Sequence, residues 1–273
     1  MEMSKMKLAG VKTILTGAGG GIGAETARAL AAQGAVIALL GRNRAVLDEV
    51  SSSINSAGGS SLVIEADLLD AAQRDAAVDH AVKELGGVDL LINNAGQQSF
   101  RPFAEEDPAV LERIIRLNTI TPMLITRRLL PQMLERDHGR IVNIGSTFGS
   151  IAFAWFAAYS ASKFGLRGFT EALRRELADT NIGVTYVAPR AVKTKLNSSA
   201  VYQMAQEVKM NMDEPDWVAA RIVDGIVSGK KELYLGFPES IFVRINALFP
   251  RLVDRALFKQ NLKMSPFARG EYQ

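Results

Sequence analysis

Short apolar runs rich in β-branched residues alternate with longer stretches of helical periodicity along most of the chain. Strands that are apolar on both faces and separated by helices are typical of a parallel sheet that helices cover on each side. The pattern therefore predicts a doubly wound α/β fold, a parallel sheet flanked by helices on both faces. The apolar runs occupy residues 11–15, 35–40, 62–67, 88–96, 140–146, 182–189 and 232–236, and helical periodicity covers residues 22–33, 44–57, 71–85, 108–136 and 159–179.

A basic amphipathic segment at residues 240–263 follows the last predicted strand. We place one domain at residues 1–238 and a C-terminal amphipathic extension at residues 239–273. Pro250 is expected to kink or split this segment. Such a helix packs on its own domain or on a partner subunit, or it lies on an anionic membrane, and the sequence leaves these alternatives open. Its basic residues are Arg244, Arg251, Arg255 and Lys259, and its apolar residues are Phe242, Ile245, Phe249, Leu252, Val253 and Leu257.

The net charge of +3 comes entirely from this extension. Residues 1–238 carry 26 basic and 26 acidic side chains, whereas residues 239–273 carry 6 basic and 3 acidic ones. A balanced body argues against a nucleic-acid partner. The chain has no cysteine and two histidines, so disulfides and thiolate sites are excluded and no metal site is expected. Because no apolar leader follows the first residues, the expected location is the cytoplasm, with membrane association through the extension as the alternative.

Residues 141–162 form a run of 22 residues without a formal charge, which is long enough to span a membrane. The polar side chains in this run would need hydrogen-bond partners in lipid, and two glycines interrupt it. We therefore interpret the run as a buried strand followed by a loop that lines a pocket. The polar residues are Asn143, Ser146, Thr147, Ser150, Tyr159, Ser160 and Ser162.

The turn after the first predicted strand has the sequence TGAGGGIG, from Thr16 to Gly23, and a helix begins at about Ile22. Glycines in this position let the backbone approach a pyrophosphate, whose charge is stabilised by free N–H groups at the helix N-terminus. Such a turn is a weak signal alone. Its position between a strand and a helix favours a dinucleotide site.

The second predicted strand ends with Gly41 at the position of the ribose-binding acid of an NAD site, and Arg42 follows it. The guanidinium of Arg42 can bind the 2′-phosphate of NADP(H), and no acid is present there to bind the free 2′-hydroxyl of NAD(H). NADP(H) is therefore the preferred cofactor. The alternative is NAD(H), with Arg42 as a solvated surface residue.

Further motifs follow the glycine-rich turn in order: Asp67, NNAG at residues 93–96, Asn118, Ser146 and Tyr159-x-x-x-Lys163. Together they resemble the short-chain dehydrogenase/reductase family across nearly the whole chain, to about residue 237. Each motif is common alone, but the complete set at the expected strand ends and helices is specific. The resemblance implies a single Rossmann-fold catalytic domain and an NAD(P)-dependent oxidoreductase that acts on CH–OH donors.

Tyr159 and Lys163 lie one helical turn apart, so their side chains share a helix face. A phenol has a pKa of about 10. A nearby ammonium favours the ionised form, which lets Tyr159 exchange a proton with a substrate oxygen at neutral pH. Ser146 would hydrogen-bond the same oxygen. The resemblance further implies that Lys163 binds the nicotinamide ribose and that Asn118 anchors a proton-relaying water.

The resemblance also assigns residues that would contact the cofactor. Asp67 would accept a hydrogen bond from the adenine amine, and it could also cap the following helix. Asn93 would support the central strand, while Ala95 and Gly96 allow close approach. The expected set is Thr16, Gly17, Gly21, Ile22, Gly23, Arg42, Asn43, Asp67, Asn93, Ala95, Gly96, Tyr159, Lys163, Pro189, Val192 and Thr194.

The chain departs from the family after the sixth predicted strand, where the usual Pro-Gly is replaced by Pro189-Arg190. A large cation therefore stands where the backbone passes the cofactor. The side chain of Arg190 either points away from the cofactor or contacts a phosphate or an acidic substrate group.

Apolar residues between Ser146 and Tyr159 predict a hydrophobic substrate pocket, although some of them could form a subunit contact instead. We expect ketone, acyl-chain or fused-ring substrates. Residues 195–213 are the least regular segment near the site and are expected to form a mobile lid. The expected substrate-binding residues are Gln97, Phe148, Phe153, Trp155, Phe156 and Leu196.

These features predict an NADP(H)-preferring oxidoreductase that transfers hydride between nicotinamide and a carbonyl or secondary alcohol. The alternatives are an NAD-dependent alcohol dehydrogenase that works oxidatively and a non-catalytic, cofactor-sensing scaffold. The family's usual subunit contact, through the helices that carry Asn118 and Tyr159, implies a homodimer or homotetramer.

Overall fold

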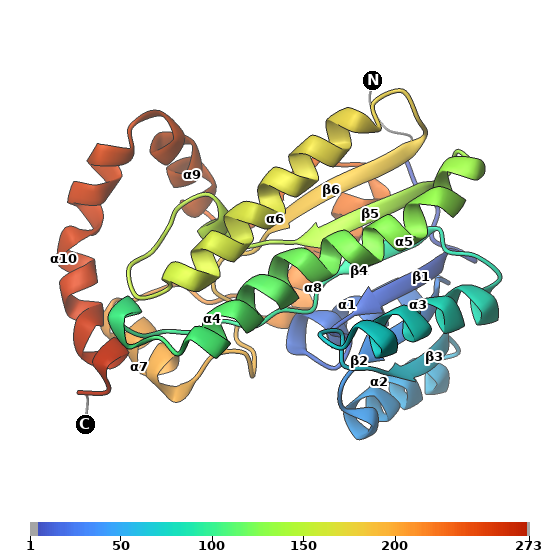
Figure 1. Ribbon diagram of the computed structural model, residues 1–273, viewed down its shortest axis with the longest axis horizontal. Helices are drawn as coiled ribbons and strands as arrows, with labels where there is room; N and C mark the ends of the chain where they lie inside the picture. The colour runs from blue at the N-terminus through green and yellow to red at the C-terminus, as the bar shows by residue number, and fades with distance from the viewer. Residues whose placement is uncertain (1–4, 272–273) are drawn as a thin grey trace.

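The computed structural model describes residues 5–271 and contains a seven-stranded parallel sheet with helices on both faces (Figure 1). The strand order is β3-β2-β1-β4-β5-β6-β7, and each neighbouring pair is parallel. The predicted doubly wound α/β fold is confirmed. The strands are β1 (Lys12–Thr16), β2 (Val36–Gly41), β3 (Ser60–Glu65), β4 (Leu90–Asn93), β5 (Gly139–Ile144), β6 (Ile182–Ala188) and β7 (Glu232–Tyr234).

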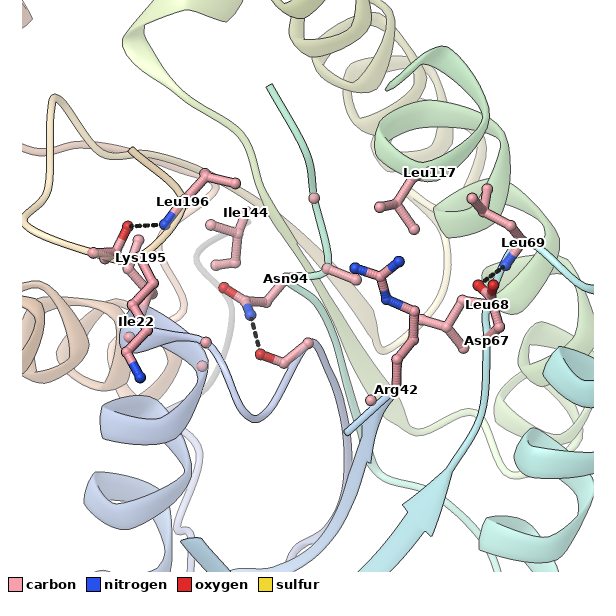
Figure 2. Close-up of a pocket in the computed structure, with 18 of the residues that line it drawn as sticks. Ile22, Arg42, Asp67, Leu68, Leu69, Asn94, Leu117, Ile144, Lys195 and Leu196 are labelled. Atoms are coloured by element: carbon pink, nitrogen blue, oxygen red, sulfur yellow. Dashed lines mark hydrogen bonds between the residues drawn. The ribbon is translucent and has the colours of Figure 1, made fainter. Parts of the chain in front are cut away.

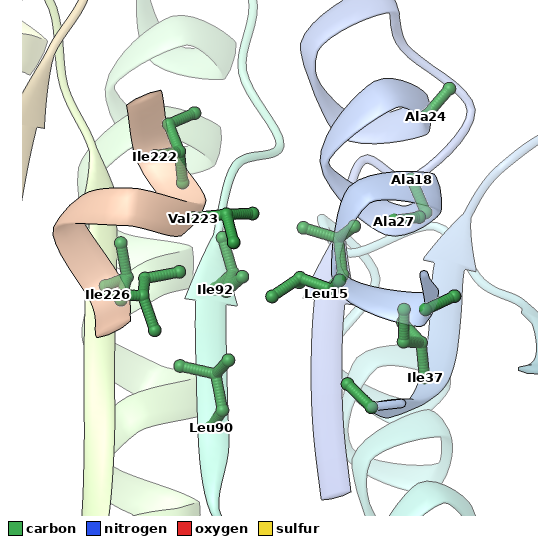
Figure 3. Close-up of a cluster of buried hydrophobic side chains, with 14 of the residues drawn as sticks. Leu15, Ala18, Ala24, Ala27, Ile37, Leu90, Ile92, Ile222, Val223 and Ile226 are labelled. Carbon is green, nitrogen blue, oxygen red and sulfur yellow. The ribbon is translucent and has the colours of Figure 1, made fainter. Parts of the chain in front are cut away.

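Two layers of helices cover the sheet, and each layer has its own apolar cluster. One layer consists of α1 (Gly21–Ala31), α2 (Arg44–Ser56) and α8 (Pro215–Val227). Figure 3 shows part of its cluster, in which side chains of α1 and α8 pack beside β1 and β4. The opposite layer consists of α3 (Ala71–Leu85), α5 (Thr121–Glu135) and α6 (Ala157–Glu176).

Neighbouring residues of the central strands contribute to opposite layers. Leu15 and Leu39 belong to the cluster of α1 and α8, whereas Ile14 and Leu40 belong to the other cluster. All four side chains are fully buried. Because side chains alternate between the faces of a strand, a sheet covered on both sides requires the continuous apolar runs seen in the sequence.

From β1 the chain adds β2 and β3 on one side of β1 and then returns to add β4 on its other side, so the strand order reverses between β1 and β4. In open α/β sheets, ligands bind at this point, outside the carboxyl ends of the strands. Thr16 ends β1, and its Oγ1 accepts hydrogen bonds from the backbone N–H groups of Asn94 and Ala95, at 3.0 and 3.1 Å. The turn after β1 and the segment after β4 are thereby held against each other.

The long predicted helix at residues 108–136 is interrupted by a wider turn. It consists of α4 (Pro108–Ile115), a π-helical turn (Arg116–Ile120) and α5. Asn118 is buried within the π-helical turn. Such single turns are frequent at functional sites, because they change the direction of the residues that they contain.

The expectation that residues 195–213 are irregular is wrong for their central part. This part forms α7 (Ser199–Glu207), which begins after Ser198, whose side chain accepts a hydrogen bond from the N–H of Val201. Val201, Met204 and Ala205 are buried. The sequence interpretation missed this helix, which packs an apolar face toward the site.

The C-terminal extension forms a hairpin of α9 (Glu239–Leu248) and α10 (Pro250–Arg269), drawn in red in Figure 1. Pro250 is the first residue of α10, so it splits the segment into two helices as expected. α10 packs against α7, and α9 lies against the short 3-10 helix η3 (Thr147–Gly149). A second 3-10 helix, η1 (Phe103–Glu105), precedes α4. Within residues 5–271, every helix is too short or too polar to cross a bilayer.

Candidate active site

A cavity of about 350 Å³ opens at the carboxyl ends of β1, β2 and β4 (Figure 2). Its volume is typical of small-molecule sites, which measure about 300–1,000 Å³. Many residues that the sequence suggested for the cofactor line it: Gly17, Gly21, Ile22, Gly23, Arg42, Asp67, Ala95, Gly96, Tyr159, Lys163 and Thr194. Leu196, which was expected to contact the substrate, also lines this cavity.

The glycine-rich turn between β1 and α1 is closely packed. Gly17 has a φ of +67°, which favours glycine, and a Cβ there would lie 2.8 Å from the Cα of Ala95. The Nδ2 of Asn94 donates to the carbonyl oxygens of Thr16 and Gly17, at 3.0 and 3.1 Å. Gly20 precedes α1 without a side-chain cap, so the first N–H groups of this helix can bind an anion. The turn fits the pyrophosphate of a dinucleotide.

Arg42 and Asp67 lie at the other end of the cavity. Arg42 is exposed at the end of β2, and Figure 2 shows its side chain extending along the cavity beside Leu68 and Asp67. Asp67 Oδ1 accepts a hydrogen bond from the N–H of Leu69 at 3.0 Å. The alternative that Asp67 caps α3 is wrong, because Asp70 is the cap and its side chain accepts from the N–H of Gln73.

Five residues of the expected cofactor set lie outside the lining of this cavity. Thr16 ties the turn to the β4 segment, and Asn93 Nδ2 donates to the buried Asn143 Oδ1 at 2.8 Å, which supports the central strands as the resemblance implied. Asn43 caps α2 through the N–H of Val46 at 3.2 Å. The two others, Pro189 and Val192, line an adjoining pocket.

Ser146, Tyr159 and Lys163 are buried where the cavity meets this adjoining pocket. Tyr159 and Lys163 share a face of α6, and Lys163 Nζ lies 5.7 Å from the centre of the Tyr159 ring. Lys163 Nζ donates to the carbonyl oxygen of Ile144 at 2.8 Å. Ser146 Oγ accepts from the N–H of Phe148 at 3.1 Å, which holds the serine at the start of η3. The structure brings the predicted catalytic side chains together.

The pKa of Tyr159 differs from the sequence expectation. Proximity to an ammonium was expected to favour the phenolate, but burial raises the pKa of Tyr159 to about 12, and the hydrogen bond with Ser146 offsets only part of this rise. Burial also lowers the pKa of Lys163 to about 8. At neutral pH Tyr159 therefore keeps its proton, and this is the form that can donate a proton to a substrate oxygen.

Asn118 is fixed beside Lys163 by hydrogen bonds from both sides of its amide. Its Oδ1 accepts from the N–H of Gln97, and its Nδ2 donates to the carbonyl oxygen of Gln97, each at 2.8 Å. Nδ2 also donates to Ser162 Oγ at 2.9 Å. A Cβ at Gly96 would lie 3.3 Å from Asn118 Oδ1 and 3.7 Å from Lys163 Nζ, so this glycine preserves the space between the two groups.

Tyr186 holds the backbone of Ser146 and was missed by the sequence interpretation. The Ser146 N–H donates to the Tyr186 hydroxyl at 3.3 Å, and this hydroxyl donates to the Ser146 carbonyl oxygen at 3.1 Å. A Cβ at Gly145 or Gly149 would overlap the Tyr186 ring or hydroxyl. Burial raises the pKa of Tyr186 above its ordinary value, so the hydroxyl stays protonated and keeps both bonds.

The adjoining pocket, of about 90 Å³, lies on the other side of Tyr159 and Ser146. Of the expected substrate residues, Phe148, Phe156 and Leu196 line it. Phe153, Trp155 and Gln97 do not. Phe153 stacks on Phe148, Trp155 Nε1 donates to the carbonyl oxygen of Asn261 in α10 at 3.2 Å, and the backbone of Gln97 holds Asn118.

The side chain of Arg190 points away from the cofactor cavity and forms an ionic cluster. It donates to the two carboxylate oxygens of Asp213 at 2.7 and 2.9 Å and to Glu239 at 3.1 Å. It also donates to the carbonyl oxygen of Phe237 at 3.2 Å. Gly236 has a φ of +98°, and a Cβ there would lie 2.6 Å from the Cδ of Arg190. Of the two alternatives for Arg190, the one in which it points away from the cofactor is therefore correct.

Several lining residues gave no signal in the sequence interpretation. Asn94 stands inside the NNAG motif, so its neighbours could have indicated it. The apolar lining residues carry no local chemical signature, because only the fold brings them to the site. They are Leu68, Leu69, Leu117 and Ile144, all in the large cavity. Within residues 5–271 no cluster of acidic and histidine side chains could hold a metal ion.

Comparisons with known proteins point to one family. The family model described as short chain dehydrogenase matches residues 12–205. Ketoacyl reductase HetN of Nostoc sp. is 33% identical over 254 residues, which cover 91% of this chain and 88% of the relative. A fatty acyl-CoA reductase of Mycobacterium tuberculosis is 31% identical over 271 residues, which cover 97% of this chain and 89% of the relative.

One solved structure is similar in fold. It is a metagenomic short-chain oxidoreductase in complex with NADP, with a TM-score of 0.72 and 30% sequence identity. The match covers 84% of this chain and 98% of that chain.

Proposed function

The chain belongs to the short-chain dehydrogenase/reductase family and is an NAD(P)-dependent oxidoreductase, and on this premise we propose that it uses NADP(H) to reduce a carbonyl group of a hydrophobic substrate. In the reverse direction it would oxidise the corresponding alcohol. The observation that carries the proposal is one cavity with Arg42 near one end and Tyr159 and Lys163 at the other. A dinucleotide that lies along this cavity would place its ribose phosphate at Arg42 and its nicotinamide at Tyr159.

The cofactor preference is supported by the residues at the end of β2. Gly41 and Arg42 line the cavity, and no acidic side chain follows the strand there. A guanidinium favours the 2′-phosphate of NADP(H), whereas NAD-specific sites bind the free 2′-hydroxyl through an acid. The NADP in the similar metagenomic enzyme supports the same preference.

The residues of this chain would act on the carbonyl oxygen. When bound, the reduced cofactor supplies the hydride that adds to the carbonyl carbon and is itself oxidised to NADP⁺. The electron pair of the C=O π bond moves to the oxygen, which takes the proton of Tyr159, so the carbonyl becomes an alcohol. Ser146 donates a hydrogen bond to the same oxygen as its charge develops. Tyr159 then regains a proton from solvent.

The acyl nature of the substrate is supported by two observations. The pocket beside Tyr159 is lined by Phe148, Phe156, Val201 and Met204, which favour an apolar group. The names of two relatives, a ketoacyl reductase and a fatty acyl-CoA reductase, describe carbonyl groups that carry alkyl chains. A hydrophobic ketone or acyl compound fits both.

The test is the affinity for NADPH and NADH, measured by nicotinamide fluorescence. Arg42→Ala should weaken NADPH binding about 10- to 100-fold and leave NADH binding almost unchanged, because it removes a charged hydrogen bond to the phosphate. Arg44→Ala is the matched control, since Arg44 pairs with Asp48 at 3.0 Å on the surface of α2. Tighter NADH binding in the wild type, or no selective loss in Arg42→Ala, would favour the NAD-dependent oxidative alternative instead.

The non-catalytic alternative makes a different prediction. A cofactor-sensing scaffold would bind NADPH without turnover of any carbonyl compound. The common position of Ser146, Tyr159 and Lys163 beside the cavity favours catalysis, because a protonated phenol there can donate to a carbonyl oxygen.

We also propose that the protein forms a homodimer or homotetramer through α5 and α6. Leu124, Leu134 and Phe164 are exposed apolar residues on these two helices. A groove of about 300 Å³ separates the helices and is lined almost entirely by apolar atoms. Sedimentation velocity should show an oligomer for the wild type and a smaller species for Phe164→Glu, which places a charge in the contact.

A peripheral contact with anionic membranes is proposed for the turn of the hairpin. Leu248 and Phe249 are 73% and 62% exposed there, and the basic residues Arg251 and Arg255 follow in α10. Apolar and basic side chains together favour the interface of an anionic bilayer. Co-sedimentation with phosphatidylserine vesicles should exceed that with phosphatidylcholine vesicles and should fall when Leu248 and Phe249 are changed to Ser.

A further inference from the structure

The C-terminal hairpin encloses a second apolar cavity, of about 500 Å³, between itself and the loop that precedes α6. Phe242 and Ile245 of α9 and Leu257 of α10 line one side. Phe148 and Phe153 of the loop line the other side. The volume is within the range of about 300–1,000 Å³ of ligand pockets. The hairpin lies outside residues 12–205, so the family match does not account for this cavity.

The hairpin cavity adjoins the small pocket of about 90 Å³ beside Tyr159 and Ser146, called the catalytic pocket from here on. Phe148, Arg190, Ala191 and Met210 line both of them. The ring of Phe148 lies 6.0 Å from the ring of Tyr159 and 4.6 Å from the ring of Phe153, measured between ring centres. Phe148 therefore lies between the catalytic tyrosine and the hairpin cavity, so a substrate that occupies both spaces must pass this side chain.

The pocket beside Tyr159 is small for a hydrophobic substrate. Its volume is about 90 Å³, against about 500 Å³ for the hairpin cavity and about 300–1,000 Å³ for most ligand pockets. A carbonyl group and its nearest carbons fill such a space. The remaining apolar part of a larger substrate must leave the pocket, and the apolar space next to it is the hairpin cavity.

Arg190 is the one charged residue among the four that line both spaces, and its charge does not oppose an apolar ligand. The guanidinium of Arg190 is paired with Asp213 and Glu239, and its side chain is only 17% exposed. Glu239 begins α9, Asp213 precedes α8, and Arg190 follows β6. The ionic cluster therefore fastens the start of the hairpin to the loops of the active site and fixes this side of the cavity.

We propose that the hairpin cavity binds the linear alkyl chain of a substrate whose carbonyl group lies against Tyr159. The substrate class is then a long-chain acyl carbonyl compound rather than a fused-ring ketone. An alkyl chain can bend around Phe148 because its bonds rotate, whereas a rigid ring system cannot pass between two spaces that one aromatic ring separates. The inference rests on the proposed carbonyl reduction and adds no further chemical step.

The test is kcat/KM for NADPH-dependent reduction of butanal, octanal, dodecanal and the fused-ring ketone decalone. In the wild type, kcat/KM should rise about tenfold or more from butanal to dodecanal, since each buried methylene contributes to binding. Decalone should remain a poor substrate. Equal values for the three aldehydes, or a preference for decalone, would overturn the inference and leave carbonyl reduction intact.

Variants that fill the hairpin cavity test whether the increase of kcat/KM with chain length depends on this cavity. Ile245→Trp should abolish the increase with chain length while the value for butanal stays within about twofold, because Ile245 lines the hairpin cavity and not the catalytic pocket. Ile241→Trp is the control, since Ile241 is an exposed residue of the same helix. If Ile245→Trp fails to fold, Leu252→Trp fills the cavity from a largely exposed position.

The outcomes separate the two proposals. A variant with full butanal activity and a preserved increase with chain length would overturn the cavity assignment alone. Wild-type protein that binds NADPH and reduces none of the four compounds would overturn carbonyl reduction, and the alkyl-chain inference with it.

Discussion

The edge of the sheet and the C-terminal hairpin both surround the proposed substrate, but they are built differently. At the sheet edge, buried polar groups hold the backbone, as Tyr186 does for Ser146 and Asn94 does for the glycine-rich turn. In the hairpin, apolar side chains line the cavity and many others are exposed, and one ionic cluster at Arg190 fastens the start of α9. On the proposed function, the chemistry would depend on backbone geometry at the sheet edge, whereas the choice of substrate would depend on exchangeable side chains of the hairpin.

The substitution with the largest expected effect changes the catalytic tyrosine and leaves the hairpin intact. Tyr159→Phe should lower kcat for every carbonyl substrate about 100- to 10,000-fold, because the general acid is lost. NADPH affinity should change little, since the ring remains. Steady-state kinetics and fluorescence titration measure the two. Tyr234→Phe is the control, because the Tyr234 hydroxyl forms a hydrogen bond with Ser150 at 3.0 Å and lines neither the large cavity nor the catalytic pocket. A variant that keeps a tenth of the activity would refute the role of Tyr159.

The next contrast is in stability. Leu39→Ala should lower the free energy of unfolding by about 2–5 kcal/mol, because Leu39 is fully buried on β2, an interior strand of the sheet. Leu262→Ala in α10 should change it by about 0.5 kcal/mol or less, because Leu262 is largely exposed. Urea denaturation measures both. Similar losses for the two variants would mean that the hairpin surface is covered in solution.

The fastening of the hairpin is tested by Arg190→Ala. This variant leaves Asp213 and Glu239 without their shared cation, so backbone amides of α9 and α10 should exchange hydrogen about 10- to 100-fold faster. Amides of β1 and β2 should keep their protection. Arg251→Ala, on the exposed side of the same hairpin, is the matched control. Uniform loss of protection in both regions would show that Arg190 supports the whole domain instead.

The smallest expected effect is a pH dependence confined to the sheet edge. Because the pKa of Lys163 is about 8, its charge is lost above that pH, and kcat/KM for reduction should fall by about tenfold per pH unit. The effect of rising pH on the stability of the fold has the opposite sign. An unfolded lysine titrates at about 10.4, so between these pH values the unfolded chain binds more protons and the contribution of Lys163 to stability rises with pH. Lys163→Arg should remove the alkaline decline, and a wild-type profile that stays flat to about pH 9 would contradict this assignment.

Local patterns were sufficient to predict the strands and most of the helices, and the order of the motifs, through its resemblance to a family, selected the candidate catalytic residues. The apolar run that contains Leu39 and Leu40 is continuous because both faces of its strand are buried. Tyr159 and Lys163 are one helical turn apart, so their proximity follows from spacing alone.

Contacts between distant parts of the chain could not be predicted in this way. Tyr186 binds Ser146 across 40 positions, and Arg190 meets Asp213 and Glu239 across 23 and 49 positions. The predicted direction of the Tyr159 pKa shift was wrong for the same reason. Burial is produced by the whole fold, and its effect on this pKa outweighs that of the neighbouring Lys163. The π-helical turn at Asn118 likewise has no separate signal in a continuous helical pattern.

The two cavities have different value as targets for inhibitors. The large cavity at the sheet edge is built from the glycine-rich turn and the Tyr-Lys pair, which lie in the segment that the family model matches, so we expect a compound that fills it to bind many relatives. The hairpin cavity is lined by residues of α9 and α10, beyond the segment that the family model matches. A small apolar compound placed there would gain selectivity from side chains that other members need not share.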